Sequence, residues 1–133
     1  MSGQNAMYCN YCKNTCISAM CTNLAFGPEV IIIILNRGQG IQYKVKINFF
    51  EDLNLYNFIE YKETGVNYKL IGVVTHLGEN DSSGHFIAYC KNPINLKWYQ
   101  FNDSVVNEVI NFKAEVIDYA MPYLLFYQKI TSQ

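Results

Sequence analysis

A glycine–histidine pair stands where a polar loop gives way to an apolar strand, in the stretch SSGHFIAYCKN at residues 82–92. His85 could serve there as a general base, because imidazole exchanges a proton near neutral pH. Such a base needs an acceptor side chain on one ring nitrogen, so that the tautomer is fixed and the other nitrogen faces a nucleophile. The neighbouring strand must supply that acceptor.

The segments HFIAYCK and KWYQFND, at 85–91 and 97–103, are predicted strands joined by NPIN. If Pro93 and Ile94 form the turn of a hairpin, His85 faces Asn102. A three-residue turn shifts the pairing by one, and His85 then faces Asp103. Facing side chains lie about 4.5–5.5 Å apart at Cβ. Either loop therefore predicts an acceptor beside the imidazole.

We expect this acceptor to take the proton on Nδ1 and to leave Nε2 for the nucleophile. An Asn acceptor orients the ring without adding charge, which suits a thiol because a Cys–His pair ionises readily. The alternative is a purely structural hydrogen bond between His85 and Asn102. Gly84 would let a substrate backbone approach closely, because it has no side chain.

The elements that must position these residues are predicted to be mostly antiparallel β. The chain has 133 residues, enough for one domain with a core, and its eleven Tyr and eight Phe favour strands. We expect about seven strands and one or two short helices. VIIIIL at 30–35 is predicted to be buried on both faces and to form a hairpin with 41–50. A helical turn is expected within 51–59, a short helix at 112–120, and further strands at 68–78 and 123–130.

Charge and hydropathy exclude several classes of function. The formal net charge is −1, which gives no basis for binding nucleic acid or an anionic membrane surface. The longest apolar run is far shorter than the roughly 20 residues of a membrane span. No secretory signal is evident at the start of the chain. We expect a cytoplasmic or nuclear protein, in which five cysteines hold metal more readily than disulfides.

The stretch YKLIGVVTHLGENDSSGHFIAYCKNPINLKWYQFNDSVVNEV strongly resembles the His box of ubiquitin-specific proteases. PEVIIIILNR, VKINFFEDLNLYNFI and AMPYLLFYQK resemble further segments of that family, so the likeness runs from about residue 8 to 129. It implies an α+β, mostly antiparallel fold: the palm and part of the fingers of a papain-like cysteine protease, without the N-terminal thumb lobe. We expect one partial domain, with a finger remnant at 1–27 and the palm at 28–133.

The resemblance assigns roles to individual residues. His85 matches the catalytic base and Asn102 the third member of the triad, while Asp103 matches an adjacent acid that supports the site. His76, Gly84 and Phe86 match positions that flank the C-terminal tail of ubiquitin. The list of site residues is therefore His85, Asn102, Asp103, His76, Gly84 and Phe86.

Three departures from the family pattern are visible. The family's nucleophilic cysteine lies in an N-terminal box that this sequence does not contain, and Cys90 lies on the opposite strand face from His85. Arg37 is followed by Gly38 where the family has Phe, which thins the wall of the tail channel. Phe86 replaces the usual Tyr and loses one hydroxyl.

Cys9 and Cys12 form a CxxC pair where the family carries the second half of a zinc ribbon. Structural zinc needs four tetrahedral ligands. The pair could be completed by a segment outside this sequence, the local Cys16 and Cys21 could complete it, or the metal could have been lost. No cofactor is expected for catalysis.

Two hypotheses of function follow. The chain could be the C-terminal portion of a ubiquitin carboxyl-terminal hydrolase, inactive alone, that supplies His and Asn/Asp to the triad. Alternatively, it could be a catalytically dead module that binds ubiquitin or another partner. Because one lobe of the fold is missing, we expect exposed apolar surface that is covered by the N-terminal half, a second copy or a bound partner.

Overall fold

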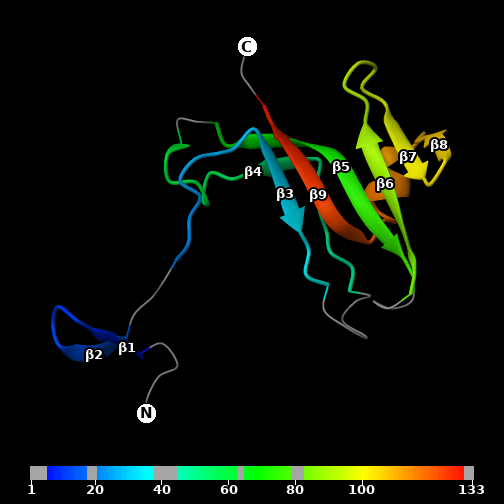
Figure 1. Ribbon diagram of the computed structural model, residues 1–133. Coiled ribbons are helices and arrows are strands. Elements are labelled where there is room, and N and C mark those ends of the chain that lie inside the picture. The colour runs from blue at the N-terminus through cyan, green and yellow to red at the C-terminus, as the bar shows by residue number, and fades with distance from the viewer. Residues whose placement is uncertain (1–5, 18–20, 38–44, 63–64, 79–82, 131–133) are drawn as a thin grey trace.

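The chain folds into a small hairpin and one larger antiparallel sheet (Figure 1). The structure, a computed structural model, describes residues 6–17, 21–37, 45–62, 65–78 and 83–130. The hairpin pairs β1 (Ala6–Cys9) with β2 (Asn14–Ile17) and lies away from the larger sheet in Figure 1. The predicted fold class, mostly antiparallel β with little helix, is confirmed.

The larger sheet has seven strands in the described part of the chain, in the order β3-β9-β5-β6-β7-β8, with β4 also pairing with β5. A short π-helical turn, Lys113–Ile117, precedes the last strand. In chain order the strands are β3 (Val30–Ile34), β4 (Asp52–Asn54), β5 (Asn67–Leu77), β6 (His85–Lys91), β7 (Trp98–Asn102), β8 (Val105–Glu108) and β9 (Pro122–Lys129).

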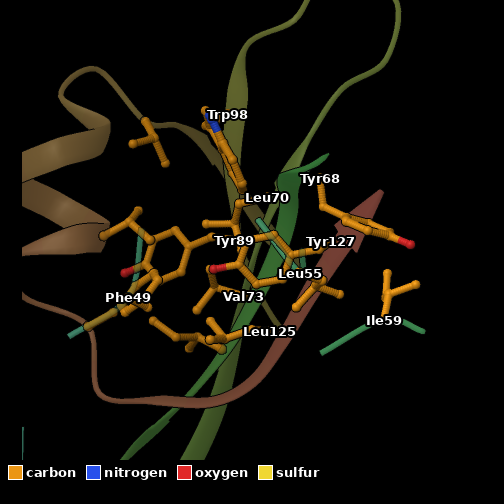
Figure 2. Packing of buried hydrophobic residues seen from close by; sticks show 14 residues of the cluster. Phe49, Leu55, Ile59, Tyr68, Leu70, Val73, Tyr89, Trp98, Leu125 and Tyr127 are labelled. Atoms are coloured by element: carbon orange, nitrogen blue, oxygen red, sulfur yellow. The ribbon is translucent and has the colours of Figure 1, made fainter. Parts of the chain in front are cut away.

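One face of this sheet carries the hydrophobic core. β5 is the longest strand, and Val73 pairs with both Tyr89 on β6 and Leu125 on β9, so these three side chains share a face. Figure 2 shows them packed together with Phe49 and Leu55, which come from the segment before β5. Burying each such side chain contributes about 1.5–3 kcal/mol. The core therefore holds β5 and β6 firmly in place.

The first apolar strand differs from its prediction. β3 is one of the two edge strands of the sheet, and among the described residues it pairs with β9 and not with 45–50. Its burial alternates, and Ile32 and Ile34 are 55% and 71% exposed. The prediction of burial on both faces is wrong, because no layer of the described chain covers the second face.

Other elements also differ in detail. Residues 45–50 form no strand, and 41–44 lie outside the described residues. The expected helical turn in 51–59 begins instead as β4, and one turn follows in which the Ile59 amide donates to the Leu55 carbonyl. β8 was not predicted at all. The strands predicted at 68–78, 85–91 and 97–103 are confirmed, and every observed boundary lies within one residue of the predicted one.

The expected helix at 112–120 shortens to the turn Lys113–Ile117, and Pro122 opens β9 directly after it. Within the described ranges, no helix has both the length and the apolar character to cross a membrane.

Candidate active site

His85 is fixed at the first position of β6 by the ladder with β5. Leu77, the last residue of β5, pairs with His85, and the ladder continues through His76 opposite Phe86. The His85 side chain is 42% exposed. The imidazole thus sits at one end of the sheet, on a backbone held by the core and open to solvent.

The structure brings His85 and Asn102 together. Nε2 of His85 lies 2.6 Å from Oδ1 of Asn102, the last residue of β7. An amide oxygen only accepts hydrogen bonds, so Nε2 carries the hydrogen in this contact. The ring nitrogen Nδ1 is then the one that can receive a proton. This reverses our expectation, in which Asn102 bound Nδ1 and Nε2 faced the nucleophile.

The register that produces this contact also differs from both predicted registers. Ala88 pairs with Phe101 and Lys91 with Trp98, because the connection runs through residues 92–97 and not through a two- or three-residue turn. Continuing this ladder sets Asn102 level with Ile87, two residues along from His85 and on the same face. In the first predicted register His85 faced Asn102, and the observed register is shifted from it by two residues. Because two is an even number, Asn102 stays on the same face of the sheet as His85. The two side chains are therefore diagonal neighbours and not directly opposite each other.

Asp103 lies farther from the imidazole than Asn102 does. Its Oδ2 is 3.8 Å from Nε2 of His85, and its side chain is 81% exposed. Asp103 begins the two-residue turn between β7 and β8 and has a φ of 50°. Asp tolerates this left-handed conformation better than most residues. Because Asp103 is so exposed, water screens most of any interaction between its carboxylate and the imidazole.

The three residues expected to flank a substrate tail lie together on the other face of β5 and β6. The rings of His76 and Phe86 have centroids 4.7 Å apart, and Phe86 lies 5.4 Å from Tyr123. A Cβ added to Gly84 would overlap Cε1 and Nε2 of His76. The glycine is therefore required by close packing on the imidazole.

Two contributors to this cluster were missed from the sequence. Tyr123 comes from β9, far away in the chain, and only the pairing of β9 with β5 brings it near. Gly78 also packs on His76, since a Cβ there would lie 2.7 Å from Cε1. Gly78 and Gly84, which flank residues 79–82 in the sequence, were the available signal. A hollow of about 410 Å³, lined partly by Thr75 and Gln100, adjoins the cluster.

None of the five cysteines stands beside His85. Cys90 pairs with Gly72 and Tyr99, and an odd spacing from His85 puts it on the opposite face of β6, as predicted. Burial raises the pKa of the Cys90 thiol, which makes it a poorer nucleophile at neutral pH. Cys9, Cys12 and Cys16 belong to the β1–β2 hairpin, which lies apart from the larger sheet (Figure 1), and Cys21 follows it in the chain.

The CxxC pair occupies the end of β1 and the turn that follows. Backbone N–H groups of Cys12 and Tyr11, followed by the Cys12 side chain, lower the pKa of the Cys9 thiol. Amide groups directed at a sulfur favour a thiolate, the form that binds metal, so the pair fits a metal-binding role. Within the described part of the chain, however, no three His, Cys, Asp or Glu side chains are grouped to hold an ion.

The sheet with a His–Asn pair at its end defines the palm of a papain-like cysteine peptidase, and comparison with known proteins gives the family. The sequence profile of the family described as "Ubiquitin carboxyl-terminal hydrolase" matches residues 2–127. The chain belongs to this family.

Individual relatives agree with this assignment. The chain is 26% identical over 135 residues to "Ubiquitin carboxyl-terminal hydrolase Usp2" of Drosophila melanogaster, covering 97% of this chain and 14% of the relative. Its fold matches a chain of the SAGA Ubp8/Sgf11/Sus1/Sgf73 DUB module bound to ubiquitin aldehyde, with a TM-score of 0.77 and 28% identity over 98% of this chain and 30% of that one. The same module bound to monoubiquitin, with Ubp8(C146A), also matches with a TM-score of 0.77 and 28% identity, over 100% of this chain and 30% of that one.

Proposed function

We propose that this chain supplies the general base and its orienting residue to a thiol peptidase that cleaves the bond after the C-terminal glycine of ubiquitin. The 2.6 Å contact between His85 Nε2 and Asn102 Oδ1 carries the proposal. The relatives add to it, since a ubiquitin-bound module shares the fold. The chain spans 14% and 30% of the proteins compared, so the activity belongs to a larger assembly.

His85 would act through Nδ1. A cysteine thiol contributed by another segment gives its proton to Nδ1, and the thiolate attacks the carbonyl carbon of the terminal glycine. The imidazolium then returns the proton to the leaving amine, and water hydrolyses the thioester with His85 again as base. Asn102 is a positioning residue throughout, because its amide oxygen holds the Nε2 hydrogen and keeps the ring from turning.

Selection of the ubiquitin tail would fall to the aromatic cluster at the same end of the sheet, on the opposite face of β5 and β6 from His85. His76, Phe86 and Tyr123 form an aromatic wall of rings tilted by 59° and 72° to one another, and the backbone of Gly84 packs closely on His76. A glycine–glycine tail is slim enough to lie against such a wall, whereas bulkier residues would collide with it. The missing hydroxyl of Phe86 removes one polar contact but keeps the ring.

Cys9 and Cys12 are proposed as two ligands of a structural zinc ion whose remaining ligands come from outside the described residues. The N–H groups around Cys9 support this role. The five free cysteines are consistent with the cytoplasmic or nuclear location proposed for the protein.

A second candidate function is a catalytically silent module that binds ubiquitin. The position of Cys90 on the face opposite His85 favours it, because no cysteine of this chain is set to attack a substrate. The two candidates share the tail-binding wall and differ only in whether a thiol reaches Nδ1 of His85.

Hydrolysis of a fluorogenic ubiquitin conjugate separates the two. The chain alone should show no turnover. Turnover should appear when a separately expressed segment carrying the family's cysteine box, taken from Drosophila Usp2, is added. The same mixture with His85→Ala is the control and should remain inactive. Binding of ubiquitin without turnover in the mixture would favour the silent module, and an upstream reading frame with a cysteine box would exclude it.

A further inference from the structure

A cluster of thiols lies in the β1–β2 hairpin, apart from the candidate active site. Sγ of Cys12 is 3.6 Å from Sγ of Cys16, and both residues are exposed. Cys16 has no role in the proposed zinc pair or in the peptidase chemistry. Two exposed thiols in contact can react with each other, independently of the peptidase chemistry.

The hairpin geometry holds the two sulfurs together. β1 and β2 pair with Met7 opposite Cys16 and Cys9 opposite Asn14, so Cys16 projects from the same hairpin face as Cys9. The turn then folds Cys12 back over that face, and Lys13 adopts a φ of 55° to allow it. The proximity of Cys12 and Cys16 is thus a consequence of the strand register and the turn.

We propose that Cys12 and Cys16 form a reversible disulfide, which makes this hairpin a redox-sensitive modification site. A disulfide bond is about 2.05 Å long, so the sulfurs must approach by about 1.5 Å, which rotation of two exposed side chains provides. The bond closes a loop between residues only four apart. So short a loop gains little stability from the unfolded chain, and an exposed disulfide of this kind is readily reduced.

The oxidant is a small-molecule disulfide such as oxidised glutathione. The thiolate of one cysteine attacks it, forms a mixed disulfide and expels one glutathione thiolate. The thiolate of the second cysteine then attacks the protein sulfur of that mixed disulfide, forms the Cys12–Cys16 bond and expels the second glutathione. The two protein thiol protons end on the two glutathione thiolates, so two protein thiols and one oxidised glutathione give one protein disulfide and two reduced glutathiones.

Oxidation would also affect the metal pair proposed above. A sulfur in a disulfide has no thiolate charge and no longer binds zinc. Cys12 belongs to both pairs, so the two states exclude each other. This consequence depends on the proposed zinc role, whereas the disulfide itself does not.

Mass spectrometry of the 133-residue chain tests the inference directly. The chain is stripped of metal with a chelator, reduced, equilibrated with glutathione buffers of rising oxidation and then alkylated. Two of its five thiols should become protected, with loss of two hydrogens from the intact mass. Trypsin cleaves after Lys13, between the two cysteines, so the bond should join the peptide ending at Lys13 to the one beginning at Asn14.

Variants identify which cysteines pair. The joined peptides should persist in the double variant Cys9→Ser/Cys21→Ser, which removes the other two hairpin-region thiols. They should be lost in Cys12→Ser and in Cys16→Ser. The inference is overturned if all five thiols are still alkylated in the most oxidising buffer. It is also overturned if the joined peptides persist in Cys12→Ser or disappear in the double variant.

Discussion

Among the described residues, one close polar contact holds the imidazole of His85, and that contact decides which nitrogen can act as a base. Asn102 Oδ1 accepts from Nε2 at 2.6 Å, whereas Asp103 Oδ2 is at 3.8 Å on a side chain that is 81% exposed. Orientation of the ring should therefore depend on Asn102 and little on Asp103. The two adjacent residues provide a matched pair of variants.

Nitrogen-15 NMR of the histidine ring should detect this difference in the chain by itself. Neutral His85 should be protonated on Nε2 in the wild type, because Asn102 fixes that tautomer. Asn102→Ala should give a mixture of both tautomers, while Asp103→Ala should leave the wild-type pattern. An unchanged tautomer in Asn102→Ala would refute the positioning role.

Turnover by the mixture of this chain with the cysteine-box segment should rank His85, Asn102 and Asp103 by their effect on kcat. His85→Ala removes the general base and should lower kcat by about 10²–10⁴-fold. Asn102→Ala keeps the base and should cause a smaller loss, mainly in kcat, and Asp103→Ala the smallest. Equal losses in Asn102→Ala and Asp103→Ala would show that distance to Nε2 does not set the effect.

At the scale of elements, the backbone that enters β6 depends on Gly84, which packs against the His76 ring. Gly84→Ala should destabilise the fold by roughly 1–3 kcal/mol, because the added Cβ would overlap the His76 imidazole. Gly72→Ala is the matched control: its Cβ would sit 3.4 Å from the Phe126 ring, an ordinary contact. It should change stability by less than about 1 kcal/mol. Urea unfolding of both variants checks this, and equal losses would contradict it.

Pairs of elements also explain what the sequence could and could not predict. The alternation of apolar residues was enough to find β5, β6 and β7. The odd spacing of five residues between His85 and Cys90 was enough to put them on opposite faces of β6. The register was wrong because the loop at 92–97 is closed by its own hydrogen bonds: the Asn92 amide donates to the Lys97 carbonyl, and Asn92 Oδ1 accepts from the Ile94 amide. Such a loop is set by local side chains that strand patterns do not reveal.

Contacts between distant elements were beyond sequence patterns altogether. β9 pairs with both β3 and β5, and this pairing brings Tyr123 to the His76–Phe86 pair. The run VIIIIL resembles a central strand in composition, yet β3 lies at the edge. Composition cannot distinguish the two cases, because the number of partners depends on the order of strands in the sheet.

A hydrogen bond between β9 and the segment before β4 predicts that the stability of the fold depends on pH. The Tyr127 hydroxyl donates to the Phe50 carbonyl at 2.7 Å, and burial raises the pKa of Tyr127 above its ordinary value of 10. Its neutral form is the stabilising one, so its contribution is complete below about pH 10 and is lost as the pH rises above that value. Tyr127→Phe should cost about 1 kcal/mol near neutral pH.

The phenylalanine variant cannot ionise at this position. The difference in unfolding free energy between wild type and Tyr127→Phe should therefore shrink as the pH rises beyond about 10. Urea unfolding of both proteins across this range measures the difference directly. A difference that stays constant through alkaline pH would exclude the stated role of the hydroxyl. Tyr68 and the other tyrosines titrate in both proteins and cancel in the comparison.

For the whole molecule, the sheet is packed on one face and open on the other. Core side chains cover the face that bears Val73 and Tyr89 (Figure 2), whereas the opposite face exposes apolar residues along several strands. These include Ile32, Ile34, Phe86, Phe101 and Val106, each between 40% and 71% exposed. A groove of about 780 Å³, lined partly by Cys90 and Phe126, crosses the same sheet. Exposed apolar residues gathered on one face of a sheet are typical of a surface that another chain covers.

Of the two edge strands in the described part of the sheet, β3 and β8, β3 combines exposed backbone with apolar side chains on the open face. β3 is a run of Val and Ile without a charged residue, and such edges associate with other strands. The purified chain should therefore self-associate or carry a bound partner. Ile34→Lys should shift it toward monomer in sedimentation, because a charge opposes burial of the edge. Asn57→Lys adds the same charge in the exposed turn after β4, which belongs to no strand edge, and should leave association unchanged. A monodisperse wild-type monomer at high concentration would contradict the prediction, as would equal effects of the two lysines.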